Sequence, residues 1–207
     1  MGCLHMNNGD PIFETARLVA RPMAHGDVQA FAAYRSDPEV ARFQSWNDYS
    51  LDEGSALIAA MEVLSLGAPG HWYQLALEER SGGTLVGDLA AKVSASEPQE
   101  MEVGFTLARA HQGHGYGTEA LRGLLDVAFG TLGLHRVIAV TDARNLPAAA
   151  LLERVGMRPE AHFHENVFFK GAWGSEFLFA VLEREWAEWG ADPSRRTLRT
   201  PRPAGAG

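Results

Sequence analysis

Apolar and polar positions alternate along much of the first half of the chain, a pattern typical of half-buried β-strands. The alternation predicts strands at residues 17–21, 72–77, 84–92 and 100–107. A Ser-Gly-Gly turn at 81–83 joins the second and third of these into an antiparallel hairpin. Apolar residues recur at helical spacing after Asp27, a predicted N-cap, and again over residues 51–66. We therefore expect the first half to form an antiparallel sheet covered by helices.

The second half of the chain alternates helices with strands. Its helices are predicted at 115–132 and 147–155, and its strands at 136–141, 161–170 and 176–182. A chain of 207 residues, 46% of them hydrophobic, is the right size for one domain with a sizeable core. We expect that domain to span residues 12–190, between a flexible leader at 1–11 and a flexible tail at 191–207.

The net charge narrows the classes of partner. It is -8 at pH 7, and the sequence pI is about 5.5, so we expect no nucleic-acid partner, and an amine suits the chain better. The one cysteine, Cys3, allows no intramolecular disulfide. No apolar run approaches the roughly 20 residues that span a bilayer. The expectation is a cytoplasmic protein that does not contact a membrane.

A glycine-rich loop connects the strand at 100–107 to the helix after it. Residues 109–119 read Arg-Ala-His-Gln-Gly-His-Gly-Tyr-Gly-Thr-Glu. A helix N-terminus offers unpaired N–H groups and about half a positive charge, and glycines let a diphosphate approach the backbone. The loop has neither the Gly-Lys-Ser/Thr of a nucleoside-triphosphate site nor the Gly-x-Gly-x-x-Gly of a dinucleotide site. Its position in mid-chain, after a hairpin, also disfavours NAD.

Within this loop, Gln112-x-x-Gly115-x-Gly117 resembles the Gln/Arg-x-x-Gly-x-Gly/Ala signature with which GNAT-superfamily enzymes bind the diphosphate of acetyl-CoA. Segments at 15–22, 36–40 and 145–157 are similar to the RimJ/RimL-type branch, which contains ribosomal-protein N-terminal acetyltransferases. The resemblance covers about residues 14–186. A glycine-rich loop alone would also fit a tight turn without a ligand, but four motifs in the same order weaken that interpretation.

The resemblance implies an α+β fold of three layers. Its central sheet would be mixed and mostly antiparallel, with about six to seven strands, splayed at the acetyl-CoA site and flanked by helices. Acetyl-CoA would be the co-substrate, and no metal ion would take part. A homodimer is compatible with the resemblance.

The resemblance also assigns residues to the cofactor. The backbone of Phe105, Thr106 and Leu107 would pair with the pantetheine arm as an added strand. Asn145 would hydrogen-bond the pantetheine region, although its position before a helix also fits an N-cap. The residues whose amides would bind the diphosphate are Gln112, Gly113, His114, Gly115, Tyr116, Gly117 and Thr118.

Direct attack of an amine on the thioester needs a group that accepts a proton, because an α-amine has a pKa of about 8 and a lysine amine of about 10.4. Glu102 is the first candidate, since its strand is expected to carry the acetyl group; the alternative is a surface glutamate on an edge strand. Glu165, His162 and His164 are further candidates on a late strand. The His-x-His pair lacks a third ligand at convincing spacing, so no metal site is predicted.

The sequence does not identify the proton donor for the departing thiolate. Ala148 stands where RimJ/RimL-type enzymes often carry serine, and Leu152 stands where many other GNAT enzymes carry tyrosine. Water or Tyr116 would have to supply the proton. The larger aromatic side chains could line an acceptor pocket, but such residues more often pack in the core or at an edge, and none is assigned to the substrate; they include Trp46, Trp72, Phe168, Phe169 and Trp173.

The predicted function is an acetyl-CoA-dependent N-acetyltransferase that acts on a primary amine, either a protein N-terminus or a small molecule. A second interpretation is a non-catalytic acyl-CoA-binding or sensory module, which the missing serine and tyrosine favour. A nucleotide-binding regulator is a more distant alternative.

Overall fold

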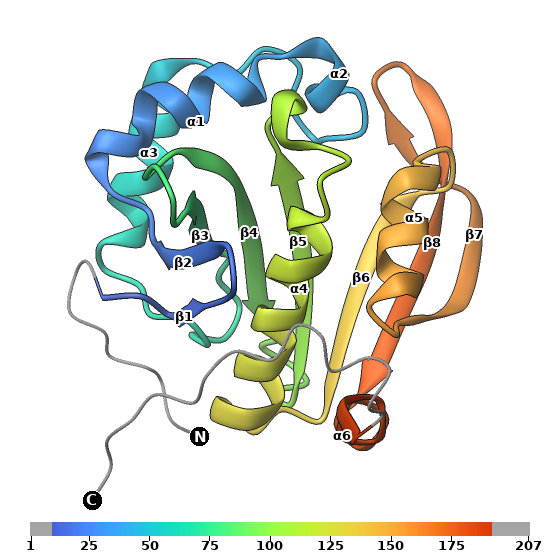
Figure 1. Cartoon of the computed structure of the whole chain (residues 1–207). Helices are drawn as coiled ribbons and strands as arrows, with labels where there is room; N and C mark the ends of the chain where they lie inside the picture. The colour runs from blue at the N-terminus through green and yellow to red at the C-terminus, as the bar shows by residue number, and fades with distance from the viewer. Residues whose placement is uncertain (1–9, 192–207) are drawn as a thin grey trace, which may run out of the picture.

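Eight strands form one sheet in the order β1-β2-β3-β4-β5-β6-β8-β7 in the computed structural model, which describes residues 10–191 (Figure 1). Cys3 and most of the predicted leader and tail lie outside the described residues. The strands are β1 (Phe13–Glu14), β2 (Leu18–Pro22), β3 (Tyr73–Glu79), β4 (Leu85–Val93), β5 (Glu100–Leu107), β6 (Arg136–Asp142), β7 (Arg158–Phe169) and β8 (Ala172–Leu182). The predicted mixed fold is confirmed. The strand beyond the predicted six to seven is β1, whose two residues are too few to show alternation.

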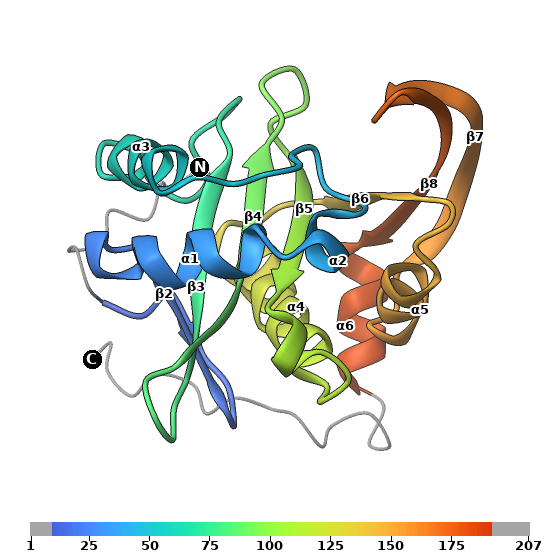
Figure 2. The same ribbon diagram turned by 90° about the horizontal axis from the view of Figure 1, so that it is seen from above.

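Helices cover both faces of the sheet. The α-helices are α1 (Val28–Arg35), α2 (Pro38–Ala41), α3 (Leu51–Met61), α4 (Tyr116–Asp126), α5 (Leu146–Arg154) and α6 (Glu183–Ala191). Short helical turns are η1 (His25–Asp27), η2 (Arg109–His111) and η3 (Val127–Thr131). Leu75 and Leu77 of β3 belong to the larger hydrophobic cluster, which contains the apolar face of α4. Ala76 between them packs with Phe31 of α1 and Ile58 of α3, on the opposite face (Figure 2).

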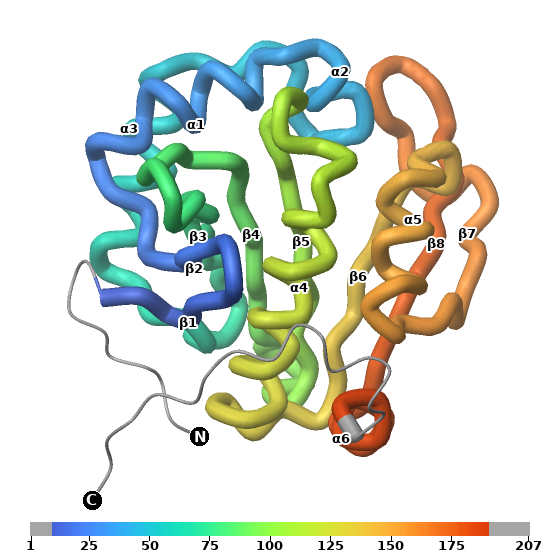
Figure 3. Tube along the Cα trace, viewed as in Figure 1, coloured from blue at the N-terminus to red at the C-terminus, as the bar shows by residue number. Residues whose placement is uncertain are grey.

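The sheet is antiparallel throughout except between β5 and β6. Those two strands pair over only three positions, the last of which joins Glu102 to Ile138. Beyond that point β6 turns away with β8, so the distance between the two chain traces widens toward the carboxyl end of β5 (Figures 1 and 3). The predicted splay is thus confirmed and lies between β5 and β6.

Helix α3 is shorter than the sequence predicted. Its start is fixed by a capping box, in which Ser50 Oγ accepts from the Glu53 N–H at 3.2 Å and the Glu53 carboxylate accepts from the Ser50 N–H at 2.8 Å. We expected the helix to reach residue 66, but it ends at Met61. Ile58 packs in the smaller cluster, whereas Leu66, 1% exposed, packs in the larger one. One straight helix cannot reach both faces of a sheet, so the chain leaves the helix between these residues.

Asp27, the predicted N-cap of α1, has the predicted position but not the expected hydrogen bond. Asp27 occupies the N-cap position, but its carboxylate makes no bond to the helix. It accepts instead from Arg21, at 2.7 and 2.9 Å, and from the Ala24 N–H. An arginine on the neighbouring strand is a stronger partner than a helix amide, because both groups are charged.

Helix α6 was not predicted. Two tryptophans make up its apolar stripe, which is too few for a periodic signal. Trp186 is 8% exposed and belongs to the larger cluster, and its indole donates to Asp126 of α4 at 2.9 Å. Helix α6 therefore packs against the rest of the fold through tertiary contacts, which the sequence pattern does not reveal.

A buried ion pair fixes α1 to the sheet. The Arg35 guanidinium donates to Asp88 of β4 at 2.7 Å, and their side chains are 4% and 1% exposed. Tyr34 also donates to Asp88, at 2.5 Å. The guanidinium lies over the rings of Phe31 and Trp46, 4.2 and 4.1 Å from their centres. The pair thus joins α1, β4 and the segment after α2.

We predict that Asp88→Asn lowers the free energy of unfolding by about 3–5 kcal/mol, because it leaves the Arg35 charge buried without a counter-charge. Urea denaturation followed by circular dichroism measures this change. Glu14→Gln is the control, since the Glu14–Arg80 pair is exposed and is worth less than about 1 kcal/mol. Equal effects of the two substitutions would contradict this account of Arg35 and Asp88.

Candidate active site

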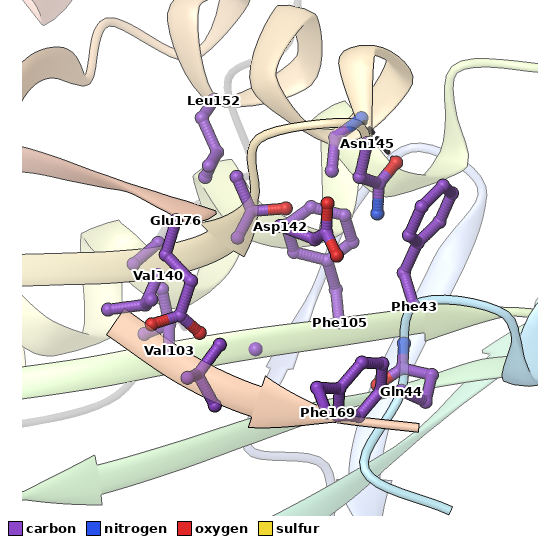
Figure 4. A pocket seen from close by; sticks show the side chains of 15 residues that line it. Phe43, Gln44, Val103, Phe105, Val140, Asp142, Asn145, Leu152, Phe169 and Glu176 are labelled. Carbon is purple, nitrogen blue, oxygen red and sulfur yellow. Dashed lines mark hydrogen bonds between the residues drawn. The ribbon is translucent and has the colours of Figure 1, made fainter. Parts of the chain in front are cut away.

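A cavity of about 170 Å3 lies where β5 and β6 part. Strand β5 forms one wall and β6 the opposite wall. The start of α5, the β7–β8 hairpin and the segment after α2 close the other sides (Figure 4). Because β6 and the start of α5 are consecutive in the chain, these walls come from four segments that are far apart in the sequence.

The strands themselves create this opening. After Glu102, residues 103–107 of β5 keep their antiparallel partners on β4 but have no strand partner on the β6 side. Buried backbone groups need a hydrogen-bond partner, and an extended ligand can supply one as an added strand. Phe105, predicted to contact the pantetheine arm, lines the cavity. Thr106 and Leu107 continue the same edge, and the Leu107 carbonyl accepts from the Gln112 side chain at 3.0 Å.

The glycine-rich loop follows β5 and ends as the N-terminus of α4. Gly113 and Gly115 have φ angles of 78° and 83°, which favour glycine, and Gly115 is the N-cap. Residues 112–115 are exposed. Within the described part of the chain, no backbone group accepts from the N–H of Gly113, His114 or Gly115, and the first N–H groups of a helix lack partners by geometry. The loop is therefore open and can receive an anion.

A charged brace holds this loop in place. Glu119 of α4, whose side chain is 2% exposed, accepts from Thr15 Oγ1 at 2.5 Å and from the Arg17 backbone and guanidinium at 2.7–2.8 Å. Burial raises the pKa of Glu119, but the bonds from Thr15 and Arg17 outweigh it and lower the pKa below its usual value. Arg17 also donates to the His114 carbonyl at 2.9 Å. Because the peptide is trans, the Gly115 N–H points away from Arg17.

Asn145 is both a helix cap and a wall of the cavity. Its side-chain oxygen accepts from the Ala148 N–H at 3.3 Å, as an N-cap does. Its amide nitrogen is turned between Asp142 and Phe43 (Figure 4). The cap predicted from the sequence is confirmed, and the position also suits a contact with a ligand.

The cavity lining has neither of the family's usual proton donors at residues 148 and 152, and its hydroxyl belongs to Thr141. Ala148 and Leu152 line the cavity, so the positions of the absent serine and tyrosine do face it. Tyr116 does not line it and donates its hydroxyl to Glu79. The hydrogen bond to Glu79 raises the pKa of Tyr116. The Tyr116 side chain therefore lies outside the cavity lining, and its role as a proton donor stays a prediction.

Glu102 lies at the closed end of the fork between β5 and β6. It is the last paired residue of β5, next to the cavity wall that starts at Val103, but it does not line the cavity itself. Its carboxylate forms an ion pair with Lys92 at 2.8 Å and is 28% exposed. The structure thus places Glu102 one residue from the opening and solvated on one side.

The other predicted candidates lie away from the cavity. His162 and His164 are exposed on β7 with ring centres 4.0 Å apart, so they share a face of the strand. Glu165 is exposed at a β-bulge with a φ of 45°. Among the described residues, no group of three or more His, Cys, Asp or Glu side chains could hold a metal ion.

Many of the residues that line the cavity were not assigned to a site by the sequence analysis, and Glu176 and Phe169 are two of them. Glu176 of β8 stands opposite Asp142 of β6 in the sheet, and its carboxylate is turned toward β5 (Figure 4). Phe169, interpreted as packing, also faces the cavity. The sequence did contain a sign of this position, because Glu176 is a charged residue at the start of an otherwise apolar strand. We interpreted that charge as marking the strand boundary.

No helix of the described residues has the length and apolar character needed to cross a bilayer.

Comparison with known proteins identifies relatives of most of the described region. The family described as Acetyltransferase (GNAT) domain matches residues 17–158. An uncharacterized N-acetyltransferase, p20 of Bacillus licheniformis, is 27% identical over 174 residues, which cover 84% of this chain and 97% of the relative.

Two solved structures share the fold. RimJ of Mycobacterium smegmatis, in complex with CoA-disulfide, has a TM-score of 0.73 and 23% identity, covering 85% of this chain and 88% of that one. The spermidine N-acetyltransferase of Vibrio cholerae, in complex with CoA and spermine, has a TM-score of 0.72 and 20% identity, covering 82% of this chain and 98% of that one.

We predict that Gly115→Glu weakens binding of CoA, the ligand expected from the sequence, by more than about 100-fold. A carboxylate about 4 Å from a diphosphate repels it by several kcal/mol. Isothermal titration calorimetry with CoA measures the change. Gly133→Glu is the control, because Gly133 has a similar φ of 65° and open space around it. A folded Gly115→Glu variant with unchanged affinity would remove the diphosphate from this loop.

Proposed function

The chain belongs to the GNAT acetyltransferase family and is an N-acetyltransferase, and we propose that it transfers the acetyl group of acetyl-CoA directly to a primary amine. The amine belongs to a small molecule or to a protein N-terminus. One observation carries the proposal: an open helix N-terminus lies at the end of the same strand whose unpaired edge lines the cavity. A ligand with a diphosphate at one end and an extended arm fits both features at once.

In the proposed reaction, the diphosphate of acetyl-CoA binds the backbone amides of residues 112–118, and its arm runs along residues 105–107. Asn145 contacts the arm. Such binding places the thioester in the cavity between β5 and β6, where it is held close to an amine. Two walls of the cavity are strands of the central sheet, β5 and β6.

The chemistry needs no covalent enzyme intermediate. The neutral amine nitrogen attacks the thioester carbon, the carbon–sulfur bond breaks, and an amide and the CoA thiol form. From the ammonium form of the acceptor, the balance is one N-acetyl amide, one CoA and one released proton. Backbone N–H groups at the edge of β5 are suited to polarise the carbonyl oxygen.

We propose that Glu102 receives the released proton through ordered water. Its carboxylate is one residue from the cavity wall and reaches solvent. Water also protonates the leaving thiolate, whose ordinary pKa of about 8.5 makes that step inexpensive. The proposed setting is the cytoplasm, and a homodimer remains a proposal from the family resemblance.

The proposal is tested with acetyl-CoA, a panel of amines and peptides, and the purified protein. Release of CoA thiol together with a mass gain of one acetyl group on an amine is the expected result. A non-catalytic binding module would bind acetyl-CoA without release of thiol. Stabilisation by ATP or NAD but not by acetyl-CoA would favour a nucleotide-binding regulator.

We predict that Glu102→Gln lowers kcat by about 100-fold or more and leaves the KM for acetyl-CoA within about twofold, because a proton acceptor acts on the reaction and not on cofactor binding. Steady-state kinetics over pH 6–9 measures both quantities. Glu165→Gln is the control and is expected to behave as the wild type. Loss of turnover in Glu165→Gln alone would move the role to β7.

A further inference from the structure

Two charged side chains line the cavity, Asp142 and Glu176. The negative charge of Asp142 is compensated by an arginine. Asp142 accepts from Arg144 three times, from its backbone N–H at 2.8 Å and from its guanidinium at 2.9 and 2.6 Å. The side-chain hydrogen bonds from Arg144 lower the pKa of Asp142, with the buried position opposing them. This carboxylate therefore remains ionised, but its charge is compensated.

The second charge, on Glu176, has no cation beside it. Its Oε2 accepts from the Asn166 amide at 2.6 Å, which orients the carboxylate without neutralising it. None of the ion pairs of residues 10–191 includes Glu176. A carboxylate in a cavity favours a cationic ligand, since its charge would otherwise be only partly solvated.

The register of the sheet places Glu176 level with the opening. Glu102 is paired with Ile138, whereas Glu176 stands opposite Asp142, four residues further along β6. At about 3.3 Å per residue, this is roughly 13 Å beyond the closed end of the fork. Glu176 is thus level with the open part of the gap, beside the proposed path of the arm along residues 105–107, whereas Glu102 lies at the closed end.

Aromatic rings line other parts of the same cavity (Figure 4). Phe43, Phe105 and Phe169 come from three different elements and line the same cavity as Glu176. Sites of this kind, apolar with one charged group, bind ligands that carry one polar group on an apolar body. The ring faces also attract a cation.

The cavity is bridged on one side. Lys170, at the turn between β7 and β8, donates its ammonium to the carbonyls of Ala41 and Trp46 at 2.6 and 2.7 Å. This contact ties the tip of the hairpin to the segment that carries Phe43. A compact molecule fits under such a bridge more readily than a long chain, and the volume of about 170 Å3 is small.

We propose that the acceptor is a small primary amine with a single positive charge on an aryl or branched alkyl group, and that Glu176 binds its ammonium. This inference rests on the proposed acetyl transfer and names its substrate class. A polyamine carries several charges and would need further uncompensated carboxylates, which the cavity lining does not provide. A peptide would need an opening where Lys170 bridges the walls.

The test compares 2-phenylethylamine, spermidine and a short peptide as acceptors at saturating acetyl-CoA. The wild type is expected to turn over 2-phenylethylamine with a kcat/KM at least tenfold above those of the other two. Glu176→Gln is expected to raise the KM for 2-phenylethylamine by 10- to 100-fold, and to leave the Kd for acetyl-CoA within twofold. Glu165→Gln, a change on the same hairpin outside the cavity, is expected to keep the wild-type KM.

Each failure has its own signature. Turnover with spermidine or the peptide above that with 2-phenylethylamine would overturn the substrate class. An unchanged KM in folded Glu176→Gln would overturn the role of Glu176. Both results leave acetyl transfer intact. The absence of thiol release with every amine, despite binding of acetyl-CoA, would instead overturn the proposed function and the inference with it.

Discussion

The parting of β5 and β6 is the constraint on which the rest of the structure depends. Two parallel strands that pair over only three positions leave one backbone edge of β5 without a partner inside the sheet. Buried N–H and C=O groups are costly without hydrogen bonds, so such an edge is stable only where water or a ligand completes it. The cavity, its aromatic walls and the position of Glu176 all follow from that divergence.

Two ion pairs hold the elements that pack on the two faces of the sheet on the β5 side of the gap. Arg17 and Glu119 fix the loop before α4, on the side where the diphosphate is expected. Arg35 and Asp88 fix α1 and the segment after it, which supplies Phe43 to the cavity. Both pairs join residues far apart in the sequence. The Arg35–Asp88 pair is buried on both partners; such a pair adds little net stability over apolar packing, but removal of one partner is costly.

Much of the fold could be predicted from the sequence, because the strongest signals are local. The strand at 100–107 was predicted with its observed bounds. The residue types of the glycine-rich loop were enough to predict an open helix N-terminus. Helix α3 was predicted too long, because periodicity does not reveal that Ile58 and Leu66 pack on opposite faces of the sheet. Glu176 was missed for a similar reason. Its role depends on the register between β6 and β8 and on the compensation of Asp142 by Arg144, and neither can be deduced from one strand.

Hydrogen exchange of backbone amides, followed by mass spectrometry with and without CoA, tests the central claim most directly. If CoA completes the edge of β5 and caps α4, exchange should slow at least about tenfold both in residues 103–107 and in residues 113–118, since both sets of amides gain partners. Unchanged exchange in both segments at saturating CoA, or protection confined to another part of the chain, would contradict the account.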